Sequence, residues 1–173
     1  MSDPVPDLPA GEFLLECVAV RQETPEAKSY VFALPPDLPG FDPGQFLNFV
    51  FEIDGEAHPR SYSVSSSALV RGRAAITVKR TKGGRVSNWF FGAMLPGLKV
   101  RASGPVGQFC CGLEPADPIL LLTAGSGITP AASMLRSLAD IASQADVVLV
   151  HFASSADDMI FADEMRYWTC RLP

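Results

Sequence analysis

The sequence predicts a β-barrel followed by the beginning of an α/β unit. From Glu12 to about Leu113, short β-branched or aromatic runs alternate with turn residues, a texture typical of a sandwich or a small barrel. After the linker-like residues 114–118, two continuous apolar runs enclose a helical stripe, which is typical of a doubly wound sheet. The 14 glycines and 15 prolines favour many turns over long helices. We therefore expect two units, residues 1–113 and 114–173.

Five strands and one helix are expected in the first unit. The third strand ends at Asp54-Gly55, a strong signal for a two-residue hairpin turn. The helix is expected to begin with Ser87 as its N-cap and to stop before Pro96-Gly97. The expected strands are residues 13–20, 29–34, 45–53, 61–65 and 74–80, and the expected helix is 87–95.

The second unit is expected to alternate strands with helices. Residues 119–123 and 146–152 are apolar runs of the kind found in strands that are buried on both faces of a parallel sheet. Apolar residues at helical spacing predict a helix between them, after the turn at residues 125–130. Residues 157–165 predict a further short helix with Asp157-Asp158 as its N-cap. This order of elements starts a doubly wound fold.

The composition excludes several classes of protein. Apolar residues make up 47% of the chain, so a core can form and wholesale disorder is excluded. No apolar run reaches the roughly 18 residues of a membrane helix, and the N-terminus lacks the pattern of a signal peptide. The four cysteines and two histidines form no metal-binding pattern. We expect a soluble, cytoplasmic protein without a metal site or membrane insertion.

The charges are distributed unevenly along the chain. Residues 57–113 contain nine of the 14 basic residues and no Asp or Glu, whereas all 19 acidic residues lie elsewhere. A block of one sign within a folded domain indicates an anionic ligand. Nucleic acid is one alternative. Strand-like apolar residues and a Gly-rich turn interrupt the block, however, and this favours a small ligand that carries phosphate.

Arg60-Ser-Tyr-Ser-Val-Ser-Ser is the sharpest local pattern. A strand with this sequence presents a cation, a flat aromatic ring and hydroxyl groups. A guanidinium suits a pyrophosphate, and a phenol ring suits a planar heterocycle. The alternative is an ordinary edge strand with a solvated Arg and a packed Tyr.

Two Gly-rich turns lead directly into helices. Gly83-Gly84 precedes the helix of the first unit, where the exposed N–H groups and the helix dipole favour an anion. Thr123-Ala-Gly-Ser-Gly-Ile-Thr-Pro joins a strand to a helix in the second unit, with Pro130 where the dinucleotide fingerprint has its third glycine. The alternatives are a plain capped helix and a tight βα turn.

Together and in this order, the motifs resemble the ferredoxin–NADP⁺ reductase superfamily, which pairs an FAD-binding Greek-key β-barrel with a nicotinamide-binding α/β domain. The sequence is most similar to the NADH reductase of the hybrid-cluster protein and to oxygenase reductases. That closer likeness is carried by residues 158–166 (DMIFADEMR). The other signatures are residues 60–66 (RSYSVSS), 83–89 (GGRVSNW), 104–109 (GPVGQF) and 122–130 (LTAGSGITP).

The resemblance implies a role for each motif. Arg60 would bind an FAD phosphate, while Tyr62 would pack on the isoalloxazine and Ser63 would face flavin N5, which makes these two the candidate catalytic residues. The flavin tail would be lined by Val78, Lys79 and Arg80, and the pyrophosphate would be held by Gly84, Arg85, Val86 and Ser87. NAD(P)H would be received by Thr123, Gly125, Ser126, Gly127, Thr129 and Pro130.

The implied activity is hydride transfer from NAD(P)H to FAD, followed by electron transfer to an iron–sulfur or haem acceptor protein. NADH is expected over NADPH because residues 151–158, at the end of the second strand, include no Arg or Lys. Family members continue through further strands, so we interpret the sequence as C-terminally truncated and expect self-association through the open sheet edge. The alternatives are a non-catalytic or partner-dependent FAD-binding module and a basic nucleic-acid binder.

Overall fold

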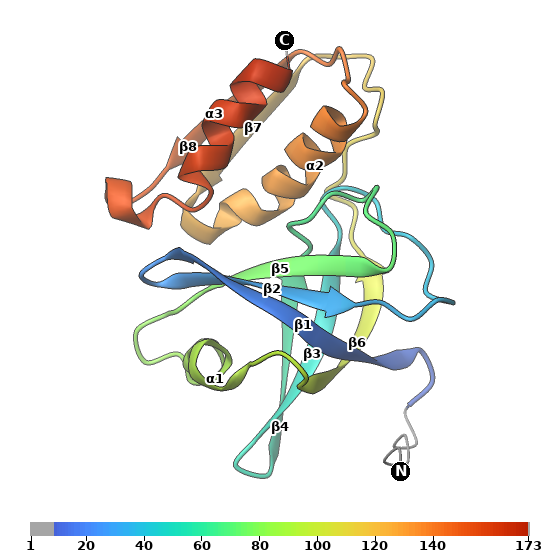
Figure 1. Ribbon diagram of the computed structural model, residues 1–173, viewed down its shortest axis with the longest axis vertical. Helices are drawn as coiled ribbons and strands as arrows, with labels where there is room; N and C mark the ends of the chain where they lie inside the picture. The colour runs from blue at the N-terminus through green and yellow to red at the C-terminus, as the bar shows by residue number, and fades with distance from the viewer. Residues whose placement is uncertain (1–8, 173) are drawn as a thin grey trace.

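Two units are stacked along the long axis of the molecule (Figure 1). The computed structural model describes residues 9–172. The lower unit is an antiparallel barrel with one helix, and the upper unit is a parallel two-stranded sheet with helices. This arrangement confirms the predicted fold class of a β-barrel plus an α/β unit.

The barrel has six strands in the order β4-β3-β6-β1-β2-β5, and every neighbouring pair is antiparallel. Strand β6 lies between β1 and β3, so the connections are those of a Greek key rather than of a simple meander. The chain after β4 closes the barrel onto β5, where the Ser65 N–H donates to the Ala75 carbonyl at 2.7 Å. The strands are β1 (Glu12–Thr24), β2 (Ala27–Ala33), β3 (Phe46–Ile53), β4 (Glu56–Ser63), β5 (Arg73–Lys79) and β6 (Lys99–Val106).

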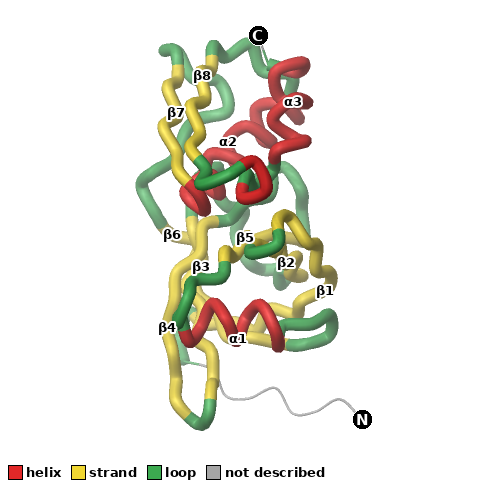
Figure 2. The backbone as a smooth tube through the Cα atoms, turned by 90° about the vertical axis from the view of Figure 1, so that its left-hand side faces the viewer, coloured by secondary structure: helices red, strands yellow, loops and turns green. Residues whose placement is uncertain are grey.

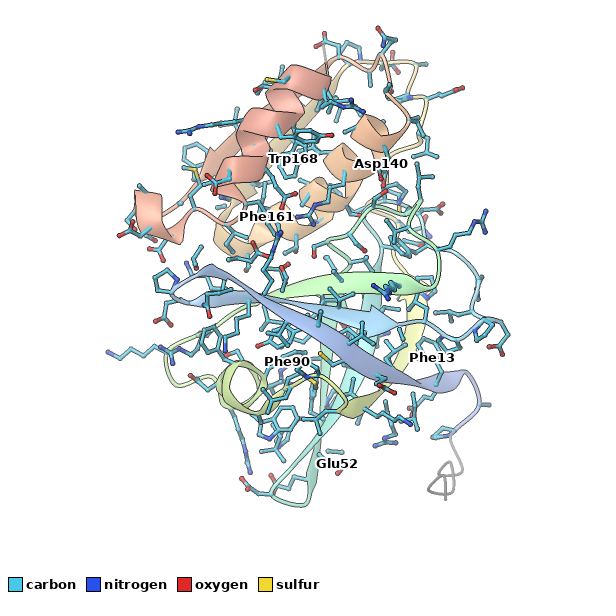
Figure 3. The ribbon with its side chains drawn as sticks, in the orientation of Figure 1. Phe13, Glu52, Phe90, Asp140, Phe161 and Trp168 are labelled. Carbon is cyan, nitrogen blue, oxygen red and sulfur yellow. The ribbon has the colours of Figure 1, made fainter. Side chains whose placement is uncertain are left out.

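Aromatic side chains fill the barrel. Helix α1 (Arg85–Ala93) runs across one end of it and inserts Phe90, which is fully buried (Figures 2 and 3). The rings of Phe90 and Tyr30 meet edge to face with centroids 4.4 Å apart, and the Tyr30 hydroxyl donates to the Phe90 carbonyl at 3.0 Å. Such pairs add to the energy of burial. The helix is therefore fixed to the barrel wall by both its side chain and its backbone.

The upper unit consists of two parallel strands and two α-helices that cover the same face of the sheet (Figures 1 and 2). Its elements are β7 (Ile119–Ala124), a 3₁₀ turn η1 (Gly125–Gly127), α2 (Ile128–Asp140), β8 (Val147–Phe152), a second 3₁₀ turn η2 (Ala156–Asp158) and α3 (Ala162–Arg171). None of the helices in the described part of the chain is long and apolar enough to cross a membrane.

Burial of β7 and β8 on both faces was a wrong prediction. Their side chains alternate between the helix-covered face and an exposed face. Both helices lie on one side, so the apolar side chains on the other side are exposed to solvent in this chain. These exposed side chains are Leu120, Leu122, Val148, Val150 and Phe152.

Three elements also differ from the prediction, two in their boundaries and one in its existence. Strand β4 begins at Glu56 rather than at residue 61, because a polar segment is recruited by its pairing with β3 through the Asp54-Gly55 turn. Both turn residues have the positive φ that such a turn requires (53° and 78°). Strand β6, rich in small residues, was not predicted. The last helix is residues 162–171 rather than 157–165, because the chain turns at Phe161 in the left-handed conformation.

The two predicted helix caps were wrong as well. Helix α1 begins after Gly84, so Ser87 is its third residue and not its N-cap. Asp157 and Asp158 lie in the 3₁₀ turn η2, where one carboxylate oxygen of Asp158 accepts a hydrogen bond from the Ser155 hydroxyl at 3.1 Å. In both places the backbone starts its turn without a side-chain cap.

Candidate functional site

A cavity of about 460 Å³ lies where the barrel meets the upper unit. Four segments form its wall: the end of β4, the end of β5, the start of α1 and the start of α2. None of the lining residues is acidic, and three are basic. The lining residues are Arg60, Ser61, Tyr62, Ser63, Thr77, Val78, Lys79, Thr81, Gly84, Arg85, Val86, Ser87, Ser126 and Thr129.

Strand β4 contributes the cation, the ring and the hydroxyl that its sequence predicted. The Tyr62 ring is half-buried and meets Phe90 edge-on, with centroids 5.6 Å apart. Burial raises the pKa of Tyr62, so the phenol stays neutral at physiological pH. Arg60 is exposed and donates to the Pro59 carbonyl at 2.7 Å. The ring is thus anchored in the core, whereas the guanidinium is free to reorient toward an anion.

The start of α1 is shaped to accept an anion. The N–H groups of Arg85, Val86 and Ser87 belong to the first helical turn and have no acceptor within the helix. No acidic residue lies in that turn. A Cβ at Gly84 would lie 2.6 Å from the Ser87 hydroxyl oxygen, so a side chain there would fill the turn. The helix dipole and the free donors therefore face an open approach.

The basic side chains differ in how they are held. The Arg85 guanidinium is bound by Asp54 and Glu56 of the β3–β4 hairpin, at 3.0 Å each. Lys79 lies 3.7 Å from Asp158 of the upper unit. Arg80 lies outside the cavity lining and pairs with Glu26 through two hydrogen bonds of 2.7 and 2.8 Å. Arg60 is the cation in the lining that is free of a carboxylate partner among the described residues.

The upper unit contributes the first turn of α2. Ser126 and Thr129 line the cavity, and the Thr129 hydroxyl donates to the Ser126 carbonyl at 2.9 Å. The other residues predicted to receive the nucleotide lie outside the lining: Thr123 at the end of β7, Gly125 and Gly127 in the turn η1, and Pro130 in the first turn of α2. The Thr123 hydroxyl is hydrogen-bonded to Nδ1 of His151 at 2.8 Å. Burial lowers the pKa of that histidine, which favours its neutral form.

Three lining residues were missed by the sequence analysis: Ser61, Thr77 and Thr81. Thr77 is buried, and its hydroxyl lies 2.7 Å from that of Ser29 and 2.9 Å from that of Ser65. A hydroxyl in the apolar stretch of a strand is the signal that would have found it. Among the described residues no three His, Cys, Asp or Glu side chains gather as a metal site.

Two protein-family models match the chain. Residues 8–110 match the model of the oxidoreductase FAD-binding domain, which covers more than half of the chain. The chain belongs to this family. Residues 121–173 match the model of the oxidoreductase NAD-binding domain. The four segments that line the cavity thus come from both matched regions of this FAD-binding family member.

Individual proteins show the same relationship. The chain is 43% identical over 163 residues to the glycine betaine monooxygenase reductase subunit of Pseudomonas aeruginosa, which covers 94% of this chain and 44% of that protein. The FAD/NAD-binding domain of nitric oxide dioxygenase from Vibrio cholerae superposes with a TM-score of 0.83 at 26% identity, over 91% of this chain and 69% of that one. Phthalate dioxygenase reductase gives 0.80 at 26% identity, over 94% and 51%. The chain spans about half the length of the curated relatives it matches.

The residues present fit the cofactor of the family. FAD combines a planar ring system with a pyrophosphate, and the cavity offers a half-buried aromatic ring beside a free helix N-terminus. The absence of carboxylates from the lining suits the charge of the phosphates.

Proposed function

We propose that this chain forms the FAD-binding part and a piece of the nicotinamide-binding part of a reductase, units 1–113 and 114–173. The reductase would take a hydride from NADH and pass electrons to an iron–sulfur or haem acceptor protein. The observation that carries the proposal is the shared cavity: the barrel supplies the cations and the ring, and the upper unit supplies Ser126 and Thr129. Flavin, when bound, supplies the step between a two-electron donor and one-electron acceptors.

The chain's own residues would bind and orient the cofactor. Arg60 would pair with a phosphate through its guanidinium, and the N–H groups at the start of α1 would bind the pyrophosphate. Tyr62 would pack against the flavin ring, and the Ser63 hydroxyl would be placed toward N5. Val78 and Lys79 would line the flavin tail. Arg80 would reach the tail only by leaving Glu26.

NADH is proposed as the donor in preference to NADPH. Selection of the 2′-phosphate needs a cation near the end of the second strand of such a unit. Residues 151–158 begin with the last two residues of β8 and contain Asp157 and Asp158 but no Arg or Lys. A phosphate placed there would meet carboxylates.

The acceptor is proposed from what related proteins do. The P. aeruginosa protein is a monooxygenase reductase subunit, and phthalate dioxygenase reductase is described as transferring electrons from pyridine nucleotides to [2Fe-2S]. The second candidate is an FAD-binding module that is inactive without another chain. It is favoured by the exposed apolar face of the β7–β8 sheet and by its two edges, which pair with no other strand among residues 9–172. A cytoplasmic location completes the proposal.

FAD binding tests the proposal directly. Purified protein loaded with FAD is expected to show a flavin spectrum, and Arg60→Ala should weaken binding by roughly 10- to 150-fold, the equivalent of about 1.5–3 kcal/mol for a charge-assisted hydrogen bond. The matched control is Arg73→Ala, which removes an exposed arginine of the same basic block from outside the cavity. Equal FAD affinity in both variants, measured by fluorescence quenching, would count against the assigned site.

A further inference from the structure

Residues 158–166, which carry the likeness to oxygenase reductases, do not line the cavity. Their two inward-facing carboxylates instead point to the barrel. Asp158 lies 3.7 Å from Lys79 on β5, and Glu164 lies 2.9 Å from Arg21 on β1. Both contacts cross from the upper unit to the lower unit. The segment therefore contributes two ion pairs between the units.

Glu164 is bound more strongly within the upper unit, by Arg136 of helix α2. Arg136 donates from Nε and Nη2 to the two carboxylate oxygens of Glu164, at 2.9 and 2.7 Å. The side chains are 18% and 29% exposed, so this two-pronged pair is shielded from water more than an ordinary surface ion pair. Arg21 binds the same carboxylate from the barrel side but is largely exposed, and it is the weaker partner.

The third guanidinium nitrogen of Arg136 binds the barrel. Its Nη1 donates to the carbonyl of Ser65, two residues after Ser63. Two further hydrogen bonds join the same helix to the same segment: Ser133 donates to the Ser66 carbonyl at 2.8 Å, and the Ala68 N–H donates to the Ser137 hydroxyl at 2.9 Å. Helix α2 is thus bound side by side to the chain that follows β4.

Phe161 shows that this arrangement is built at a cost. It is buried and has a φ of 63°, which is an outlier for a bulky residue and is unfavourable unless the surrounding contacts hold it. That conformation turns the chain into α3 and places the ring under the Arg136 guanidinium, with 4.4 Å from Cζ to the ring centroid. Figure 3 shows Phe161 at the end of the upper unit that faces the barrel. The ring thus supports the guanidinium through a cation–π contact.

The two segments joined here also form the cavity a few residues earlier. Strand β4 ends in Tyr62 and Ser63, and α2 begins beside Ser126 and Thr129. From Thr129 to Arg136 the helix rises about 10 Å at 1.5 Å per residue. A rigid helix fixed at Arg136 therefore sets how far its first turn stands from the flavin side of the cavity.

We propose that Glu164, acting through Arg136, is a positioning residue that sets the distance between the flavin-side and nicotinamide-side walls of the cavity. The clamp, defined as Glu164, Arg136, Arg21 and the Ser65 carbonyl, lies outside the cavity lining. Its effect on hydride transfer rests on the function proposed above. A shift of about 1 Å in the relative position of reacting groups can lower a rate about a hundredfold.

The test compares Glu164→Gln with Asp163→Asn in the FAD-loaded protein. Asp163 is the exposed neighbouring carboxylate on the first turn of α3, so its variant loses the same charge without touching the clamp. In Glu164→Gln we expect at least a tenfold slower reduction of bound flavin at saturating NADH, and FAD affinity within twofold of the parent. Amide exchange at Ala68, which is protected by Ser137, should accelerate about tenfold or more. Arg136→Lys, which keeps the charge but loses the fork, should fall between the parent and Glu164→Gln.

Each outcome decides the proposal. Faster Ala68 exchange together with slower reduction at unchanged FAD affinity supports the clamp. Equal behaviour of Glu164→Gln and Asp163→Asn overturns it, and so does a general loss of amide protection across the barrel, which would indicate a merely structural role. If the parent protein binds no FAD, the proposed function fails, while the Ala68 exchange still tests whether Glu164 holds the two units together.

Discussion

The sheets of the lower and upper units differ in how their strands are paired and how their faces are covered. In the barrel the two end strands of the sheet, β4 and β5, are joined by a bridge from the chain after β4, and the interior is filled by aromatic rings. In the upper unit each of the two strands has one neighbour, and apolar side chains cover an exposed face. The upper unit instead gains order from its polar contacts with the barrel. The barrel is thus stabilised by its own core, whereas the nicotinamide-side turn is positioned by the contacts of the upper unit with the barrel.

The largest expected effect is a difference in the free energy of unfolding between two phenylalanine-to-alanine variants, one in each unit. Phe90→Ala removes a fully buried ring that contacts Tyr30, Phe51 and Tyr62, and it should lower the free energy of unfolding by about 3–5 kcal/mol. Phe152→Ala removes a ring that is 64% exposed on the bare face of β8, and it should change stability by about 0.5 kcal/mol or less. Chemical denaturation followed by fluorescence measures both. A comparable loss in the two variants would mean that the face of β8 is covered in solution.

The same contrast explains what the sequence could predict of the fold. Strands with alternating aromatic and polar residues, such as β2 and β3, were predicted because the alternation itself indicates which side chains are buried. Strand β4 is mostly polar along its first half and is held by backbone pairing to β3, which leaves no trace in residue type. Likewise, the start of α1 at Gly84 carries no side-chain signal.

The sequence predicted those residues of the candidate site that lie together in one short motif. Arg60, Tyr62 and Ser63 line the cavity together because a short strand end carries all three. The pairing of Arg80 with Glu26, 54 positions away, and of Glu164 with Arg136 could not be read from local patterns. Such partners are fixed by the packing of distant elements, which a single sequence does not display.

The second prediction concerns the rate of flavin reduction. Among the described residues, the nicotinamide side of the cavity is lined only by Ser126 and Thr129. We expect the 173-residue chain to bind FAD but to be reduced by NADH about a hundredfold more slowly than the full-length P. aeruginosa relative, because a loosely placed donor loses about that much in rate. Anaerobic stopped-flow absorbance measures the bleaching.

Sedimentation in the same buffer serves as the control for that experiment. The exposed face of β7 and β8 and their free edges predict self-association. Fast bleaching by a monomer would show that this piece of the upper unit suffices for the reaction. Fast bleaching that appears only in associated protein would show that a second copy completes the nicotinamide side.

The smallest expected effect is a pH dependence of the free energy of unfolding, which arises from a carboxylate beside the contact between the units. Burial raises the pKa of Glu164, but the hydrogen bonds and charges of Arg136 and Arg21 outweigh it and hold the pKa below its usual value. A carboxylate whose pKa is lowered by folding contributes stability above its unfolded pKa of about 4.3, and this contribution is lost as the pH falls through the folded value. The stability difference between the parent and Glu164→Gln should therefore be largest near neutral pH, at about 1 kcal/mol or less for a partly exposed pair, and should shrink below about pH 4.

Glu26→Gln provides the comparison within the barrel, since the pKa of Glu26 is also lowered, by the hydrogen bond from Arg80, but at a solvent-exposed site. Urea titrations of the three proteins between pH 3 and 7 (roughly the window in which carboxylates titrate) measure the two differences. A pH dependence for Glu26→Gln as large as that for Glu164→Gln would show that shielding at the contact between the units adds nothing to the ion pair.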